Sequence, residues 1–120
     1  MDVREVLKNN CPIRDTVDII DRKWTVILLW DMFNGYQHFN EFKEINDNIS
    51  GTVLSDTLKF LIDEGLVIKK SDESTRYLLT DKGRSLNRIM YELGVYGIQS
   101  EDYDGCRDDI KEYFREIFNI

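Results

Sequence analysis

A chain of 120 residues has the size of one domain with a single core. Hydrophobic residues make up 42% of the chain and charged residues 32%, which predicts a packed core and argues against intrinsic disorder. The formal net charge of −7 excludes a protein that binds nucleic acid through a generally basic surface. Residues 20–84 carry nine basic and eleven acidic side chains and are close to neutral, so any DNA-binding surface is expected there.

Several other classes of protein lack support in the sequence. The longest apolar stretch, residues 24–33, is interrupted by Thr25 and Asp31, so no membrane span is expected. The charged N-terminus lacks the apolar run of a secretory signal, which predicts a cytoplasmic location. Cys11 and Cys106 stand far apart beside a single histidine, so we expect no structural zinc, no other metal, no cofactor and no disulfide framework.

The first half of the chain has the apolar spacing of helices. A nearly all-apolar segment ends at Gly35, and a later segment has a cap at Ser50 and a stop at Gly65. The helix capped by Ser50 follows a brief helix and a short polar turn. These three elements together predict a helix-turn-helix. The four helices are expected at residues 12–21, 23–34, 39–46 and 50–65.

The second half predicts a hairpin and two more helices. The β-prone runs Leu66–Lys70 and Thr75–Leu79 follow the helix-turn-helix directly, and that order is a winged helix. Thr80 caps a helix to about Gln99, and a polar link precedes a last helix at about residues 106–118. The fold class is therefore α+β, mainly α. It is a single winged helix-turn-helix domain over residues 1–120, with a core at about 12–97 and dimerisation helices at both termini.

Five large side chains form one stripe on the last helix. A small winged-helix domain offers no obvious internal surface for such a stripe, and an exposed apolar patch of this kind marks an interface. We therefore predict a homodimer in which the terminal helices meet. The interface residues would be Ile110, Tyr113, Phe114, Ile117 and Phe118.

Several short motifs in order resemble one family of regulators. They are Cys11-Pro12-Ile13, residues 18–24, residues 39–42, Ile49-Ser50 with Leu54, Leu58 and Leu61, residues 64–67, and residues 77–86. Over about residues 10–97 the chain resembles the HxlR-type winged helix-turn-helix transcriptional regulators of the MarR-like superfamily. The resemblance implies a cytoplasmic prokaryotic regulator that binds double-stranded operator DNA as a dimer, in a family where some members sense oxidants or electrophiles through an N-terminal cysteine.

The helix after Ser50 is the expected recognition helix. In a helix-turn-helix the N-terminal residues of this helix meet base edges in the major groove. Thr52 and Val53 offer methyl groups to thymine, Ser55 donates to either base, and Asp56 accepts from cytosine or lies near the positive end of the helix dipole. A simple solvated helix face is the alternative. The full set of candidate DNA-binding residues is Lys23, His38, Lys43, Ser50, Gly51, Thr52, Val53, Ser55, Asp56, Lys59, Lys69, Lys70 and Arg76.

The expected DNA surface departs from the family pattern. Relatives often carry basic residues or glutamine where this chain has Gly51-Thr52, and a basic pair where it has Gln37-His38; the wing tip Asp72-Glu73 is acidic. Fewer cations predict a shallower salt dependence of DNA binding. Arg76 is the best candidate for a wing arginine in the minor groove, and His38 is either a DNA contact or an ordinary surface residue.

Cys11 has two interpretations. It is a small packing residue, or a sensor whose thiol pKa is lowered by a helix N-terminus and by Arg14. As a sensor it would meet Cys106 of the partner subunit and form an intersubunit disulfide on oxidation.

Two other function classes compete with a DNA-binding regulator. The acidic balance favours a protein-interaction module that has lost operator binding. An enzyme is not expected, because the sequence has no Cys-x-x-Cys, no glycine-rich phosphate loop and no general base paired with a nucleophile. The operator sequence, the sign of regulation and any small-molecule effector are not encoded in a recognisable pattern.

Overall fold

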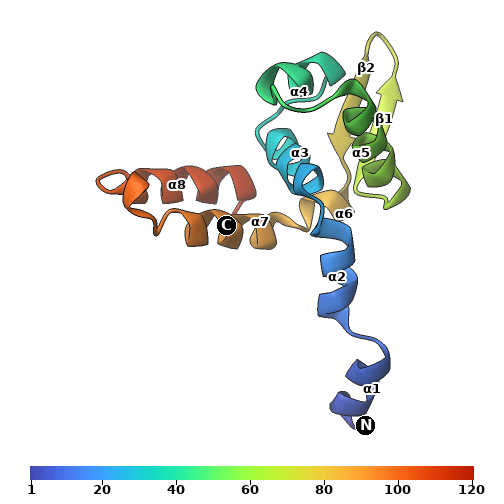
Figure 1. Ribbon diagram of the computed structural model, residues 1–120, viewed down its shortest axis with the longest axis vertical. Coiled ribbons are helices and arrows are strands. Elements are labelled where there is room, and N and C mark those ends of the chain that lie inside the picture. The colour runs from blue at the N-terminus through green and yellow to red at the C-terminus, as the bar shows by residue number, and fades with distance from the viewer.

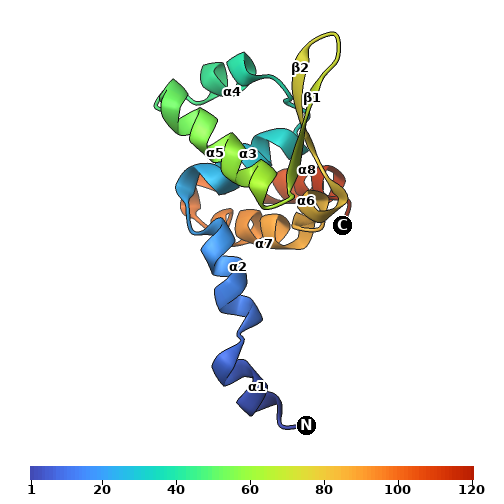
Figure 2. The same ribbon diagram turned by 90° about the vertical axis from the view of Figure 1, so that its right-hand side faces the viewer.

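Figure 1 shows the computed structural model, which describes all 120 residues. A winged-helix body carries two extensions: an N-terminal arm and a pair of C-terminal helices (Figures 1 and 2). The radius of gyration is 16.4 Å, against about 14 Å for a compact domain of this length. The elements are α1 (Val3–Asn9), α2 (Pro12–Ile20), α3 (Lys23–Phe33), α4 (Phe39–Ile45), α5 (Gly51–Asp63), β1 (Val67–Ser71), β2 (Thr75–Leu79), α6 (Asp81–Arg84), α7 (Asn87–Gly97), the 3₁₀ turn η1 (Glu101–Tyr103) and α8 (Arg107–Phe118).

The core of the body forms around α3. Leu28 and Leu29 are completely buried, because this helix is apolar on most sides and packs against α5 and β2. Phe42 of α4 is completely buried in the same cluster. The apolar residues of α5 face α3, and the helix ends where Gly65 adopts a φ of 75°, which suits a residue without a side chain. None of the helices is long and apolar enough to cross a membrane.

The wing is a two-stranded antiparallel sheet. Its register pairs Val67 with Leu79 at the base and Ser71 with Thr75 at the tip. Val67 and Leu79 are buried, whereas the tip is exposed on both strands. The predicted winged helix-turn-helix is confirmed, with the first strand beginning one residue later than Leu66.

One predicted helix is wrong in its extent. The segment predicted as one helix from Thr80 to Gln99 is two helices, α6 and α7, with a break at Ser85 and Leu86. The Ser85 hydroxyl donates to the backbone carbonyl of Lys82 at 2.5 Å, and such local bonds compete with helical continuation. The break turns α7 away from the wing. The structure also has a helix that was not predicted, α1, which is seven residues long and capped by Asp2.

The last helix folds back along α7. Arg107 ties the turn between them, since its guanidinium donates to the carbonyls of Ile98 and Ser100 at 2.7 and 2.9 Å. The absence of a side chain at Gly94 lets the ring of Phe114 lie against α7, because a Cβ there would stand 2.5 Å from that ring. The pair α7–α8 is therefore a close-packed antiparallel hairpin, extending sideways from the body in Figure 1.

The expectation that the domain offers no internal surface for the apolar stripe on α8 is wrong. Phe118 is only 2% exposed within the single chain and packs on Phe33 and Trp30 of α3, with ring centroids 5.0 and 5.6 Å apart. Phe114 and Ile117 also pack against the core, which thus extends beyond residue 97. The stripe has an internal partner because α8 folds back onto α3. A role for Tyr113 and the partly exposed edge of this stripe in dimerisation stays a prediction.

Candidate nucleic-acid interface

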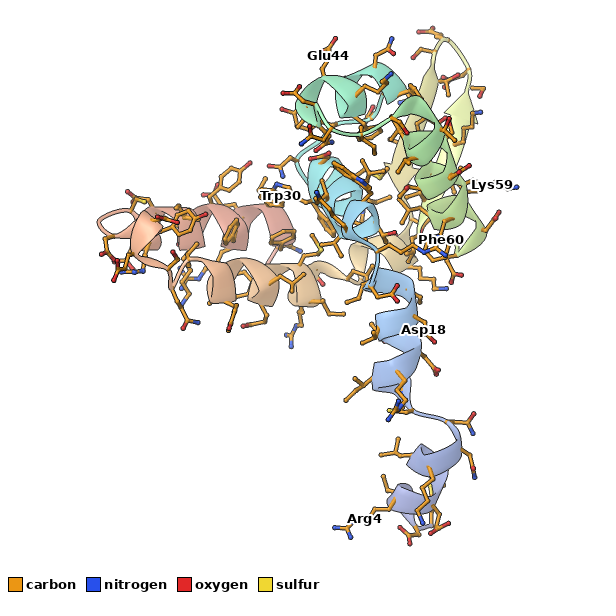
Figure 3. All side chains as sticks on the ribbon, in the orientation of Figure 1. Arg4, Asp18, Trp30, Glu44, Lys59 and Phe60 are labelled. Atoms are coloured by element: carbon orange, nitrogen blue, oxygen red, sulfur yellow. The ribbon has the colours of Figure 1, made fainter.

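Helix α5 presents a polar face at the surface of the body. Its first turn begins at Ser50, whose Oγ accepts a hydrogen bond from the backbone amide of Val53 at 3.1 Å. Leu54, Leu58 and Leu61 anchor the opposite face in the core. The predicted base-facing residues therefore point outward, and Figure 3 shows Lys59 extending away from the body. The exposed residues of this face are Thr52, Val53, Ser55, Asp56 and Lys59.

A lysine of α4 stands beside the start of α5. The Nζ atom of Lys43 lies 3.8 Å from the point where a Cβ would stand on Gly51, the first residue of α5. This ammonium adds its charge to the positive end of the helix dipole. The first turn of α5 has no basic residue of its own. Lys43 therefore makes the N-terminus of α5 more positive than the sequence of this helix alone indicates.

The segment before α4 is held by hydrogen bonds. The carboxylate of Glu41 accepts from the backbone amides of Gln37 and His38 at 3.1 and 2.9 Å, and these bonds hold its pKa below the usual value. The Nδ1 atom of His38 lies 3.0 Å from the carbonyl oxygen of Thr75, so this nitrogen carries a proton and donates to the wing. His38 thus joins the turn to the wing, a structural role that its sequence context did not reveal.

The wing carries two free lysines and one engaged arginine. Lys69 and Lys70 are exposed on β1, and the Nζ atom of Lys69 lies 5.9 Å from the ring centre of Tyr77. Arg76 pairs with Asp72 of the tip at 3.0 Å. Desolvation by itself would raise the pKa of Asp72, but the charge of Arg76 and the hydrogen bonds from Arg76 and the backbone amide of Glu73 together hold that pKa below its usual value. The predicted minor-groove arginine is therefore already bound to a carboxylate of its own wing.

One predicted contact residue lies away from this group. Lys23 begins α3, and its ammonium lies 4.8 Å from the ring centre of Trp24. Its neighbour Arg22 stacks on Phe60, 4.3 Å from the ring centre, in the last turns of α5. Phe60 is nine residues from the start of α5, about 13 Å along the axis. The structure therefore brings Lys43, His38, α5 and the wing together and leaves Lys23 at the far end.

The two cysteines lie on different extensions of the molecule. Cys11 is half-buried at the N-cap of α2, and Cys106 is exposed just before α8, where its thiol donates to the carbonyl of Tyr103 at 3.4 Å. The junction of α1 with α2 and the turn before α8 are well separated in Figure 1, so the two thiols do not meet within one chain. No group of three histidine, cysteine or acidic side chains could hold a metal ion.

Comparisons with known proteins agree with this arrangement of helices and strands. A family model described as HxlR-like helix-turn-helix matches residues 19–103. The chain is 35% identical over 94 residues to the uncharacterized HTH-type transcriptional regulator YvaP of Bacillus subtilis (strain 168), covering 74% of this chain and 87% of the relative. The redox regulator HypR has been solved in a reduced and an oxidized form, each 32% identical over 76% of this chain. The TM-scores are 0.71 and 0.69, and the matches cover 94% and 98% of those chains.

Proposed function

We propose that this chain, which belongs to the HxlR-like helix-turn-helix family of transcriptional regulators, binds operator DNA in the cytoplasm as a homodimer with α5 in the major groove. The observation that carries the proposal is the exposed polar face of α5, next to a wing with two free lysines. In Figure 2 the N-terminal half of α5 and the wing both lie in the upper part of the body, away from the N-terminal arm.

The residues of this surface divide into two kinds of contact. Thr52, Val53, Ser55 and Asp56 would meet base edges, where methyl groups suit thymine and a carboxylate suits the amino group of cytosine. The lysines would contact phosphates, which position the protein without reading sequence. The phosphate contacts are assigned to Lys43, Lys59, Lys69 and Lys70.

A titration by fluorescence anisotropy tests this function. The reduced protein is titrated into labelled DNA that surrounds its own gene, with unrelated competitor DNA, at two salt concentrations. Specific binding that survives competitor supports the proposal. Loss of each phosphate contact should reduce the salt slope by about 0.9, so Lys59→Ala weakens binding and flattens the slope. Lys111→Ala on α8, away from this surface, is the matched control. Binding no better than to competitor would favour the alternative of a protein-interaction module.

The proposal includes a thiol response at Cys11. It is supported by the 32% identity to a protein named as a redox regulator and by the half-buried thiol at a helix N-cap. An added peroxide would take two electrons and two protons from Cys11 and the partner's Cys106, forming a disulfide and water. Non-reducing electrophoresis after mild oxidation should show a band at dimer mass. The band should be absent from the variants Cys11→Ser and Cys106→Ser, and a monomer band throughout would rule out the disulfide.

A further inference from the structure

The imidazole of His38, at the junction of α4 and the wing, has one engaged nitrogen and one free nitrogen. Nδ1 lies 3.0 Å from the carbonyl oxygen of Thr75, and because a carbonyl only accepts, Nδ1 carries the proton of the neutral ring. Nε2 has no hydrogen-bond partner in the chain, and it is not buried, since the one buried side-chain polar atom without a partner is Oγ1 of Thr25. Nε2 is therefore open to solvent, and in the neutral ring it presents a lone pair.

Hydrogen bonds on either side hold this ring in place. The carbonyl of Gln37 accepts from the backbone amide of Tyr77 at 2.8 Å, and the carboxylate of Glu41 accepts from the backbone amide of His38 at 2.9 Å. The segment before α4 is thus fixed to β2 both by its backbone and by the ring of His38. Nε2 consequently has a fixed position on the candidate DNA surface, between the first turn of α4 and the wing.

The charges around the ring balance one another without a charge on His38. Glu41 interacts electrostatically with the ring, but no carboxylate forms an ion pair with it. Four basic and four acidic side chains lie on the two elements that meet here. They are Glu41, Lys43 and Glu44 of α4, and Lys69, Lys70, Asp72, Glu73 and Arg76 of the wing. A proton on Nε2 therefore has no unbalanced counter-charge in the free chain, and a DNA phosphate would supply one.

From this geometry we infer that operator binding takes up one proton at Nε2 of His38, and that the cationic ring then donates a charge-assisted hydrogen bond to a DNA phosphate. This inference deepens the proposed function and rests on it. The proton comes from solvent and bonds to the lone pair of Nε2, and no other bond changes. Imidazole gains a proton between about pH 5 and 8, so the contact responds to pH near neutrality. Nδ1 keeps its proton in both forms, so acidification strengthens the DNA contact without releasing the wing.

The pH dependence of DNA binding tests this inference. The reduced protein is titrated into the labelled DNA that surrounds its own gene, at about pH 6 and about pH 8 and at constant ionic strength. Wild-type affinity should be about tenfold higher at the lower pH, with a salt slope steeper by about 0.9. His38→Arg carries a permanent cation and should bind equally at both pH values. His38→Gln keeps an amide donor for Thr75 but cannot gain a proton, so at both pH values it should bind with the weaker affinity that wild type has at the higher pH.

Two further measurements isolate His38. Cys11→Ser removes a thiol, which titrates above neutral pH, and this control variant should keep the wild-type pH dependence. His38 is the only histidine, so its imidazole signals in proton NMR are unambiguous, and the midpoint of their titration should move to higher pH when the DNA is added. Specific binding with equal affinity at both pH values, a pH dependence that His38→Gln retains, or an unmoved midpoint would overturn the proton uptake and leave the DNA-binding regulator in place. Absence of specific binding at both pH values would overturn the proposed function and this inference with it.

Discussion

The buried carboxylate of Asp31 in α3 accepts a hydrogen bond of 2.8 Å from the side-chain amide of Asn46, the residue that ends α4. Asp31 is 4% exposed, and burial raises its pKa, an effect that the bond from Asn46 opposes without cancelling. The two residues connect the first and second helices of the winged-helix body. An ionised group in this place destabilises the folded state relative to its protonated form.

Replacement of this carboxylate should therefore change how stability depends on pH. With the folded pKa above the unfolded one, the native state binds more protons between the two values, so wild-type stability falls as pH rises through that window. Asp31→Asn keeps a side-chain oxygen that can accept the hydrogen bond from Asn46. Its free energy of unfolding should be about 1 kcal/mol higher than that of wild type at neutral pH, and nearly the same as that of wild type near pH 3. Urea denaturation at both pH values measures the difference. Asp47→Asn on the exposed turn is the control, and an equal gain at both pH values would contradict the assignment.

A second prediction concerns the close approach of α6 to the base of the wing. A Cβ at Gly83 would stand 2.1 Å from the backbone carbonyl oxygen of Leu66, a contact that only displacement of the backbone relieves. Gly83→Ala should therefore destabilise the protein by about 2–3 kcal/mol. Gly97→Ala is the matched control, because nothing lies within 4 Å of its Cβ position and alanine favours a helix. Thermal denaturation that ranks the two variants in the opposite order would refute this account.

The sequence was informative where local chemistry decides the structure. Pro12, the cap at Ser50 and the turn at Gly65 predicted helix ends correctly to within a residue or two, because each of these acts on its own backbone. The order of helices and strands then sufficed for the winged helix. The return of α8 onto α3 could not be predicted in this way. It depends on a missing side chain at Gly94 and on the bonds of Arg107 to the end of α7, which are visible only once both helices are placed.

The candidate DNA surface also combines features that the sequence predicted with features that depend on tertiary structure. Periodicity alone separated the exposed face of α5 from its buried face, and the structure has the predicted residues on the expected sides. The positions of the charges required tertiary structure, since Lys43 reaches the start of α5 from another helix and Arg76 is held by an acid four residues away. Lys23 was assigned to this surface from the sequence, but the stacking of Arg22 on Phe60 places it near the opposite end of α5.

The ion pair at the wing tip predicts that one carboxylate restrains DNA binding. Asp72→Asn would free Arg76 for the minor groove, and operator affinity at low salt should rise about three- to tenfold, with a steeper salt dependence. Glu73→Gln removes the same charge from the neighbouring position without releasing the arginine, and should raise affinity less. Anisotropy titrations compare the two variants, and Arg76→Ala in the Asp72→Asn chain should abolish the gain. Equal effects of the two single substitutions would mean that only net charge matters.

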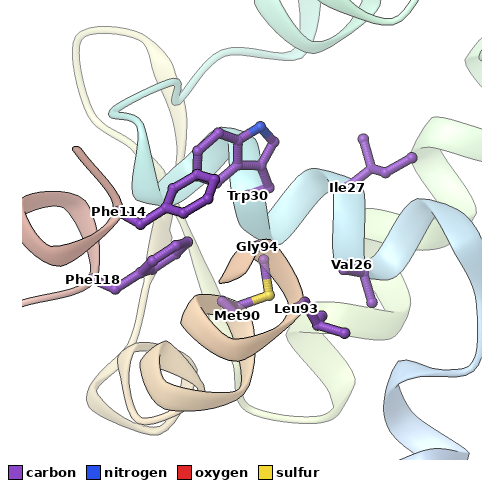
Figure 4. A pocket seen from close by; sticks show the side chains of 8 residues that line it. All are labelled: Val26, Ile27, Trp30, Met90, Leu93, Gly94, Phe114 and Phe118. Carbon is purple, nitrogen blue, oxygen red and sulfur yellow. The ribbon is translucent and has the colours of Figure 1, made fainter. Parts of the chain in front are cut away.

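Substitution of Phe118 tests whether this side chain of α8 belongs to the core of one chain or to the subunit interface. Its ring packs on Trp30, as Figure 4 shows, and on Phe33 within one chain, so Phe118→Ala should cost about 3–5 kcal/mol of folding free energy. Tyr113→Phe removes only a hydroxyl that donates to Asn34 from an exposed position, and should cost less than about 1 kcal/mol. Urea denaturation over a range of protein concentrations separates the effect on the single subunit from any effect on association. A loss below about 1 kcal/mol for Phe118→Ala at the lowest protein concentration would return this side chain to the subunit interface, because its burial within one chain would then contribute little to folding.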